Sequence, residues 1–97
     1  MSHETAIDEP VKVWALFDSS ISRAFLRINS EQVKIFPIAM SWQRRLVKFE
    51  KLILTTSRRV GHIKILTLVC ASKTANYELE YNSENYMWKL KKVMPFV

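Results

Sequence analysis

A regular alternation of side chains on both sides of a short polar segment constrains the fold of this chain more than any other feature. Large apolar residues occupy every second position of residues 77–81 and of residues 86–90, with Tyr77 and Trp88 the most prominent. Residues 82–85 between them are Asn, Ser, Glu and Asn, which favour turns. A two-residue period interrupted by turn formers is typical of a β-hairpin, so the sequence predicts a β-rich protein.

Length and composition predict one small domain without cross-links. The chain has 97 residues, of which 48% are hydrophobic. We expect residues 1–9, which are mostly polar, to form a mobile N-terminal tail and residues 10–97 to form a single β-rich domain. The one cysteine, Cys70, lies in an apolar run, which predicts a buried structural thiol, a reducing compartment and hence a cytoplasmic protein. There is no secretory signal and no apolar run of roughly 20 residues, so no membrane partner is expected.

Further strands follow from the patterns along the chain. Three are predicted by alternating or apolar segments at residues 11–18, 23–28 and 33–36. Pro37 lacks a ladder donor and therefore marks an edge, a bulge or the end of a strand. Residues 62–71 are apolar on both faces, which indicates a strand inside the sheet. We expect a mainly β fold of about six strands, as a small antiparallel barrel or a strongly curved sheet.

The segment 41–55 allows two interpretations. Four apolar residues recur at helical spacing, which would form one face of a single helix: Trp42, Leu46, Phe49 and Ile53. The end of the segment is rich in strand formers, which favours a bent pair of strands instead. Periodicity alone leaves both open, and the resemblance described below favours the strands.

Positive charge is concentrated in the middle of the chain. Residues 11–74 contain twelve Lys and Arg against three acidic residues, a net charge of +9, whereas the whole chain carries +6. Such a concentration is expected of a protein that binds a polyanion, although a solvated, solubilising surface has the same composition.

Two groups of residues are candidates for contact with nucleic acid. On one strand face, Phe25 lies between Arg23 and Arg27, an arrangement that stacks a base on the ring while guanidinium groups take phosphates, unless Phe25 is covered by a neighbouring element. The second group is a basic series expected to make non-specific, salt-dependent phosphate contacts: Arg44, Arg45, Lys48, Lys51, Arg58 and Arg59.

Catalytic chemistry has little support in the sequence. The two histidines, His3 and His62, have no partner at metal-ligand spacing, and no acid–base pair stands out. We expect no enzyme, no metal and no cofactor. Trp14, Trp42 and Trp88 are expected in the core, and the apolar C-terminal residues 93–97 either fold back onto the domain or anchor a partner or a second copy.

The chain also resembles a bacterial domain family of about this length, domain of unknown function 6504. The resemblance rests on the run from Tyr77 through Trp88 to Val93, on the opening residues 9–13, and on apolar residues spaced between them and followed by basic residues: Leu26, Ile28, Val33, Ile35, Ile38, Trp42, Arg44 and Arg45. Ile28 and Ser30 depart from it, since the family has Trp and Gly there. The resemblance implies no catalytic residue and a setting beside proteins that resemble error-prone DNA polymerases.

These observations predict a non-catalytic accessory domain that binds nucleic-acid backbone through a basic surface, in connection with DNA repair or replication. The alternative is a protein-interaction or subunit domain that docks through an edge strand or the apolar C-terminus. Either function is compatible with a monomer or a homodimer.

Overall fold

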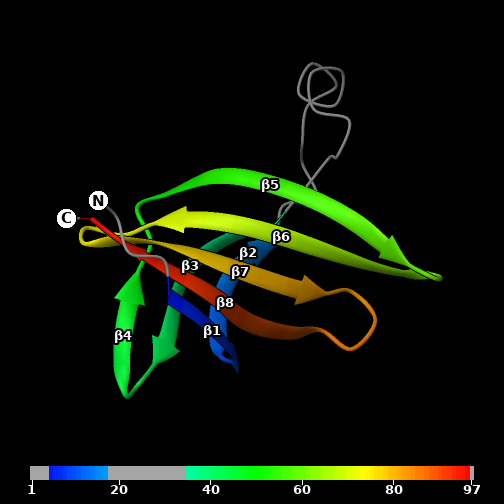
Figure 1. Cartoon of the computed structure of the whole chain (residues 1–97), viewed down its shortest axis with the longest axis horizontal. Coiled ribbons are helices and arrows are strands. Elements are labelled where there is room, and N and C mark those ends of the chain that lie inside the picture. Colours follow the sequence, from blue (N-terminus) through cyan, green and yellow to red (C-terminus); the bar gives the residue numbers. More distant parts are fainter. Residues whose placement is uncertain (1–4, 18–34, 97) are drawn as a thin grey trace.

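Two antiparallel sheets make up the protein in a computed structural model that describes residues 5–17 and 35–96 (Figure 1). One sheet has five strands in the order β1-β8-β7-β6-β5, and the other has three in the order β2-β3-β4. The strand bounds are β1 Thr5–Pro10, β2 Lys12–Phe17, β3 Ile35–Trp42, β4 Arg45–Lys48, β5 Lys51–Val60, β6 Ile63–Ala71, β7 Ala75–Asn82 and β8 Met87–Pro95. The predicted β class is confirmed, but the described strands form two sheets without closing into a barrel.

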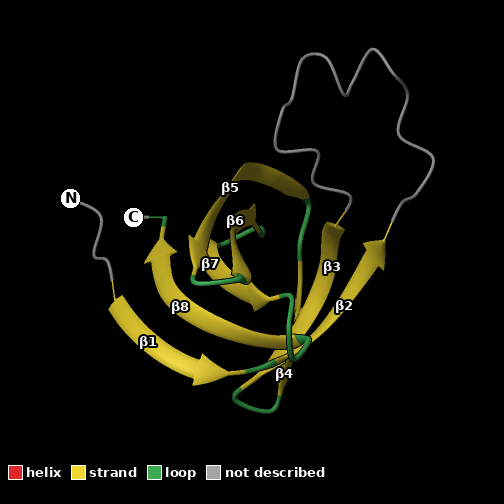
Figure 2. Cartoon of the chain, turned by 90° about the vertical axis from the view of Figure 1, so that its right-hand side faces the viewer, coloured by secondary structure: helices red, strands yellow, loops and turns green. Residues whose placement is uncertain are grey.

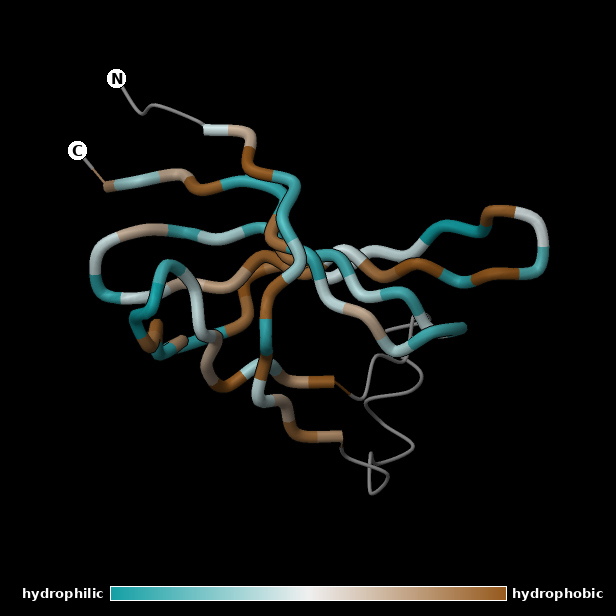
Figure 3. The backbone as a smooth tube through the Cα atoms, turned by 90° about the horizontal axis from the view of Figure 1, so that it is seen from below, coloured by the Kyte–Doolittle hydropathy of each residue, from teal (hydrophilic) through white to brown (hydrophobic). Residues whose placement is uncertain are grey.

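The core lies between the two sheets, where their apolar stretches meet in the middle of the molecule (Figure 3). Met40 of β3 is completely buried, as are Leu68, Leu79 and Leu90 of the larger sheet. The chain crosses from the larger sheet to the smaller one at Val11, between β1 and β2, and returns at residues 49–50, between β4 and β5 (Figure 2). At the first crossing, the Val11 N–H donates to the Trp88 carbonyl. Both sheets therefore depend on one shared core.

The β7–β8 hairpin confirms the strongest sequence prediction. Its inward side chains alternate with outward ones, so Tyr77, Leu79 and Tyr81 are buried. Tyr81 is paired with Trp88 across the strands, and their ring centroids are 4.7 Å apart. Aromatic pairs of this kind stabilise a sheet beyond the area they bury.

Strand β6 lies between β5 and β7, as its apolar pattern predicts. Cys70 of this strand has no exposed surface and is a structural thiol, and burial raises its pKa to about 12. A thiol with so high a pKa is almost never the reactive thiolate at neutral pH.

The helix considered for residues 41–55 is wrong, and the alternative of a bent strand pair is confirmed. β3 ends at Trp42, a turn at Gln43 and Arg44 leads into β4, and β5 begins at Lys51. The helical spacing is coincidental, because the four apolar side chains do not share an environment. Trp42 and Phe49 pack near Tyr77, with ring centroids 6.4 and 5.9 Å away. Leu46 and Ile53 stay exposed.

Register shifts occur in β3, just after Pro37, and in β8, at Lys91. Ala15 is paired with Pro37 while Trp14 is paired with Ala39, so Ile38 is an extra residue and Pro37 lies beside a bulge, one of its predicted roles. On β8, Lys91 is an extra residue opposite β7. On the other side of β8, the register of β1 shifts between Ala6 and Glu9, and Asp8 in this stretch has a φ of 57°. Bulges of this kind increase the twist of a sheet.

The two ends of the described chain lie on neighbouring strands. Residues from Thr5 onward belong to β1, which is paired with β8, so the expected tail over residues 1–9 is corrected for Thr5 to Glu9. The strand was not predicted because most of its side chains are polar and exposed, so the segment lacks the apolar alternation typical of a strand. At the other end, Val93 is buried and the Phe96 N–H donates to the Thr74 carbonyl, which fits the prediction that the C-terminal segment packs back onto the domain.

Candidate nucleic-acid interface

The described residues contain only part of the predicted binding set. Arg23, Phe25 and Arg27 lie outside the described residues, and the stacking strand they suggest stays a prediction. The other six cations are all exposed, and they divide between two ends of the molecule.

One group surrounds the β3–β4 hairpin, and the other lies at the end of β5. Arg44 is in the hairpin turn, Arg45 and Lys48 begin and end β4, and Lys51 begins β5 three residues later. Arg58 and Arg59 lie near the last residue of β5, on the opposite side of the view in Figure 1. A ten-residue strand spans roughly 30 Å at about 3.3 Å per residue. The basic series therefore does not form one continuous surface.

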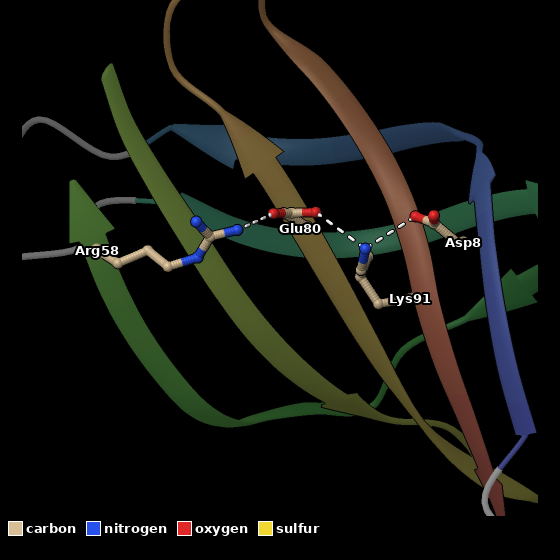
Figure 4. A network of polar contacts seen from close by, with 4 residues as sticks. All are labelled: Asp8, Arg58, Glu80 and Lys91. Atoms are coloured by element: carbon tan, nitrogen blue, oxygen red, sulfur yellow. Dashed lines mark hydrogen bonds and ion pairs between the residues drawn. The ribbon is translucent and has the colours of Figure 1, made fainter. Parts of the chain in front are cut away.

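Arg58 takes part in a chain of charges across the outer face of the larger sheet (Figure 4). Its Nη2 donates to Glu80 Oε1 at 2.7 Å, and Lys91 Nζ lies 3.6 Å from the other oxygen of the same carboxylate. Lys91 also donates to Asp8 Oδ1 at 2.8 Å. The network connects β5, β7, β8 and β1, so the Arg58 guanidinium is already engaged within the sheet.

The charges of this network shift the pKa values of its members. The hydrogen bond from Lys91 holds the pKa of Asp8 below its ordinary value, with the positive charges of Lys91 and Lys89 acting in the same direction. The hydrogen bond to Asp8 in turn raises the pKa of Lys91. Both shifts favour the charged pair.

The outer face of the three-stranded sheet has a different composition. Val13, Met40 and Val47 are paired across β2, β3 and β4 and point into the core. The next row, Trp14, Ala39 and Lys48, therefore lies on the other face of the sheet, because neighbouring positions on a strand face opposite sides. Ala39, between the two larger side chains, is itself buried. Trp14 is 48% exposed, so its predicted place in the core is wrong.

Cations flank this exposed indole. Lys12 lies two positions before Trp14 on the same face of β2, and Lys48 is in the same cross-strand row. Leu16 and Leu46 are exposed on the same face, 53% and 56%. Within residues 5–17 and 35–96, no hydrogen bond or ion pair is found for the head groups of Lys12 and Lys48. The sequence alternation already placed three residues on one face of this strand: Lys12, Trp14 and Leu16. It did not show that this face is exposed.

The turn between β3 and β4 carries backbone strain. Gln43 and Arg44 have φ angles of 52° and 61°, a left-handed conformation that favours Gly, Asn or Asp in two-residue hairpin turns. Neither residue is one of these. Strain of this kind often marks a functional position, and here it places an arginine at the tip of the hairpin.

A half-open groove of about 560 Å³ runs beside β4. One wall is the chain from Arg45 to Glu50, the other is the turn at residues 72–74, and Tyr77 lies at its base. The rim carries three cations, Arg45, Lys48 and Lys73, against one carboxylate, Glu50. Sequence reasoning missed Lys73, which lies 25 positions from Lys48 along the chain.

Other kinds of site have little support in the part of the chain that the structure describes. No group of three or more His, Cys, Asp or Glu side chains is placed to hold a metal ion there. In the same residues no helix is long and apolar enough to cross a bilayer.

No protein-family model matches the chain, and no curated protein or solved structure is significantly similar to it. The resemblance to domain of unknown function 6504 therefore stays a prediction.

Proposed function

We propose that this protein binds single-stranded nucleic acid on the outer face of its three-stranded sheet. The observation that carries the proposal is the exposed indole of Trp14 beside two cations, Lys12 and Lys48. An aromatic ring on a sheet surface stacks an unpaired base, and lysines next to it contact the neighbouring phosphates. A duplex keeps its bases stacked inside, so this face suits a single strand better.

The contacts available on this face do not select a base sequence. Ammonium groups recognise phosphate charge, and every base has a ring that stacks on tryptophan. Arg44, at the tip of the strained turn, adds a further phosphate contact at the edge of the same sheet. A non-catalytic accessory role in DNA repair or replication, which the family resemblance implies, would rest on this binding.

The test is fluorescence anisotropy with labelled DNA and RNA single strands of about 12 nucleotides and with a DNA duplex. Single strands should bind more tightly than the duplex, with affinity falling log-linearly between about 50 and 200 mM salt. Trp14→Ala should weaken binding about tenfold or more, since stacking contributes about 1–3 kcal/mol per base. Lys48→Gln should reduce the salt slope by roughly 0.7.

Arg59→Gln is the matched control, because it removes one exposed positive charge at the other end of the molecule. It should leave the affinity nearly unchanged. Equal losses in Lys48→Gln and Arg59→Gln would mean that only net charge matters, and no binding at low salt would refute the proposal.

A further inference from the structure

The free edge of β4 faces the groove between this strand and the turn at residues 72–74. The groove is lined by every residue of β4, whose side chains alternate between the two faces of the small sheet, and by Phe49 and Glu50 that follow it. Residues from both faces line one groove only if the edge of the strand borders it. The other edge of β4 is paired with β3, and β4 is the last strand of its sheet among the described residues.

The hairpin register identifies the backbone groups that point into the groove. Trp42 and Arg45 flank the two-residue turn, so they form a hydrogen-bonded pair, and the pattern alternates from there. Val47 is then bonded to β3 as well, and the Phe49 N–H donates to the Ile38 carbonyl at 2.9 Å, in agreement with that alternation. The N–H and C=O groups of Leu46 and Lys48 therefore point toward the groove.

Hydrogen bonds within the turn at residues 72–74 hold the opposite wall together. The Ser72 hydroxyl accepts hydrogen bonds from the N–H groups of Thr74 and Ala75, each 3.2 Å long, and donates to the Ala75 carbonyl at 3.0 Å. The Ser72 side chain is thus fully used within the turn. A turn held by its own hydrogen bonds loses less entropy when a ligand binds beside it.

We infer that this groove binds an extended acidic peptide segment, which adds as a fourth strand along β4. A peptide backbone offers both donors and acceptors to Leu46 and Lys48, whereas a phosphodiester offers only acceptors and would leave the carbonyls without a partner. Inward side chains of the peptide meet the apolar base at Val47, Phe49 and Tyr77.

Charge selects the kind of peptide. Arg45, Lys48 and Lys73 surround the groove, and no hydrogen bond or ion pair within the described chain engages these three head groups. Only Glu50 opposes them. Acidic side chains on the peptide would match this rim, and a basic peptide would be repelled.

Anisotropy of a fluorescein-labelled octapeptide with alternating Glu and Val tests the inference on the full chain. Binding should be saturable and should be absent for the same peptide with Lys in place of Glu. Arg45→Glu combined with Lys73→Glu should weaken it tenfold or more. The control, Arg59→Glu combined with Lys64→Glu, reverses two cations at the other end of the molecule and should keep the affinity.

Backbone pairing is tested on the peptide, where no folding defect of the protein can interfere. N-methylation of every second amide removes either the donors that face β4 or those that face away from it. One of the two methylated peptides should lose binding and the other should keep it. Equal binding of both would overturn the inference.

The peptide and the nucleic acid are separable by Trp14→Ala, which should reduce oligonucleotide binding and spare peptide binding. If an oligonucleotide instead binds more weakly to the Arg45→Glu and Lys73→Glu protein and displaces the peptide, the groove belongs to nucleic acid and the inference is wrong.

Discussion

The outer faces of the two sheets use charge in opposite ways. On the five-stranded sheet, Arg58, Glu80, Lys91 and Asp8 satisfy one another in a continuous network. On the three-stranded sheet, Lys12 and Lys48 stand beside an exposed tryptophan with no partner in the described chain. Cations that are already paired within the protein have a partner, whereas unpaired cations around an aromatic ring are available to a ligand. The outer face of the five-stranded sheet is therefore called the structural face, and that of the three-stranded sheet is the face proposed to bind nucleic acid.

The largest effects should come from the core that the two faces share. Met40 is on the core side of the three-stranded sheet and Leu79 is on the core side of the five-stranded sheet, and both are completely buried. Truncating either residue to Ala should destabilise the protein by about 2–5 kcal/mol, because it leaves a cavity. Urea unfolding followed by tryptophan fluorescence and circular dichroism measures this. Both variants should unfold in one transition, and separate transitions for the two probes would show that the sheets are independent units.

Removing charge should affect the two faces differently. Glu80 has a side chain only 14% exposed and contacts two cations, so Glu80→Gln should lower the free energy of unfolding by about 1 kcal/mol. Lys48→Gln should leave it unchanged within about 0.5 kcal/mol. Urea titrations at equal ionic strength give both values. A loss of stability in Lys48→Gln as large as in Glu80→Gln would break the distinction between the faces.

The strained turn allows a smaller gain. Arg44 has a φ of 61°, which glycine adopts without steric strain, so Arg44→Gly should stabilise the protein by about 0.5–1 kcal/mol. The same variant should weaken oligonucleotide binding if the arginine reaches a phosphate. A variant that is more stable and binds equally well would show that the turn has no part in the interface.

Local sequence patterns predicted the fold better than they predicted the site. The hairpin with Tyr77 and Trp88 was predictable because its alternation and turn are contained in one short segment. Trp14 was misplaced because alternation separates two faces of a strand without identifying which one the core will cover. Which face is buried depends on tertiary packing. Val13 is paired with Met40, a core residue far along the chain, so the face of Val13 is covered and the face of Trp14 is exposed.

The site also depends on how far strands run and where they end. The basic series reads as one group in the sequence, yet β5 carries Arg58 and Arg59 away from Arg44 and Arg45. The groove joins residues 45–50 to the turn at residues 72–74, and no local pattern indicates that contact. Tertiary arrangement therefore decides which cations act together.

The smallest expected effect is the pH dependence of the bridge between Asp8 and Lys91, and it belongs to the structural face alone. The pKa of Asp8 lies below the ordinary value of 3.8, chiefly because of the hydrogen bond from Lys91. The folded state therefore favours the charged carboxylate. Its contribution to stability is fully present above the unfolded-state pKa and is lost as the pH falls through the lower folded-state pKa.

Urea midpoints of the native chain and of Asp8→Asn should differ by a small, constant amount near neutral pH. The two midpoints should converge as the pH falls below about 3.8, the ordinary value of an aspartate. Oligonucleotide affinity of Asp8→Asn should equal that of the native chain under the same conditions, since Asp8 lies on the other sheet from Trp14. A change in affinity without a change in midpoint would mean that this network also contributes to binding, and the two faces would no longer have separate roles.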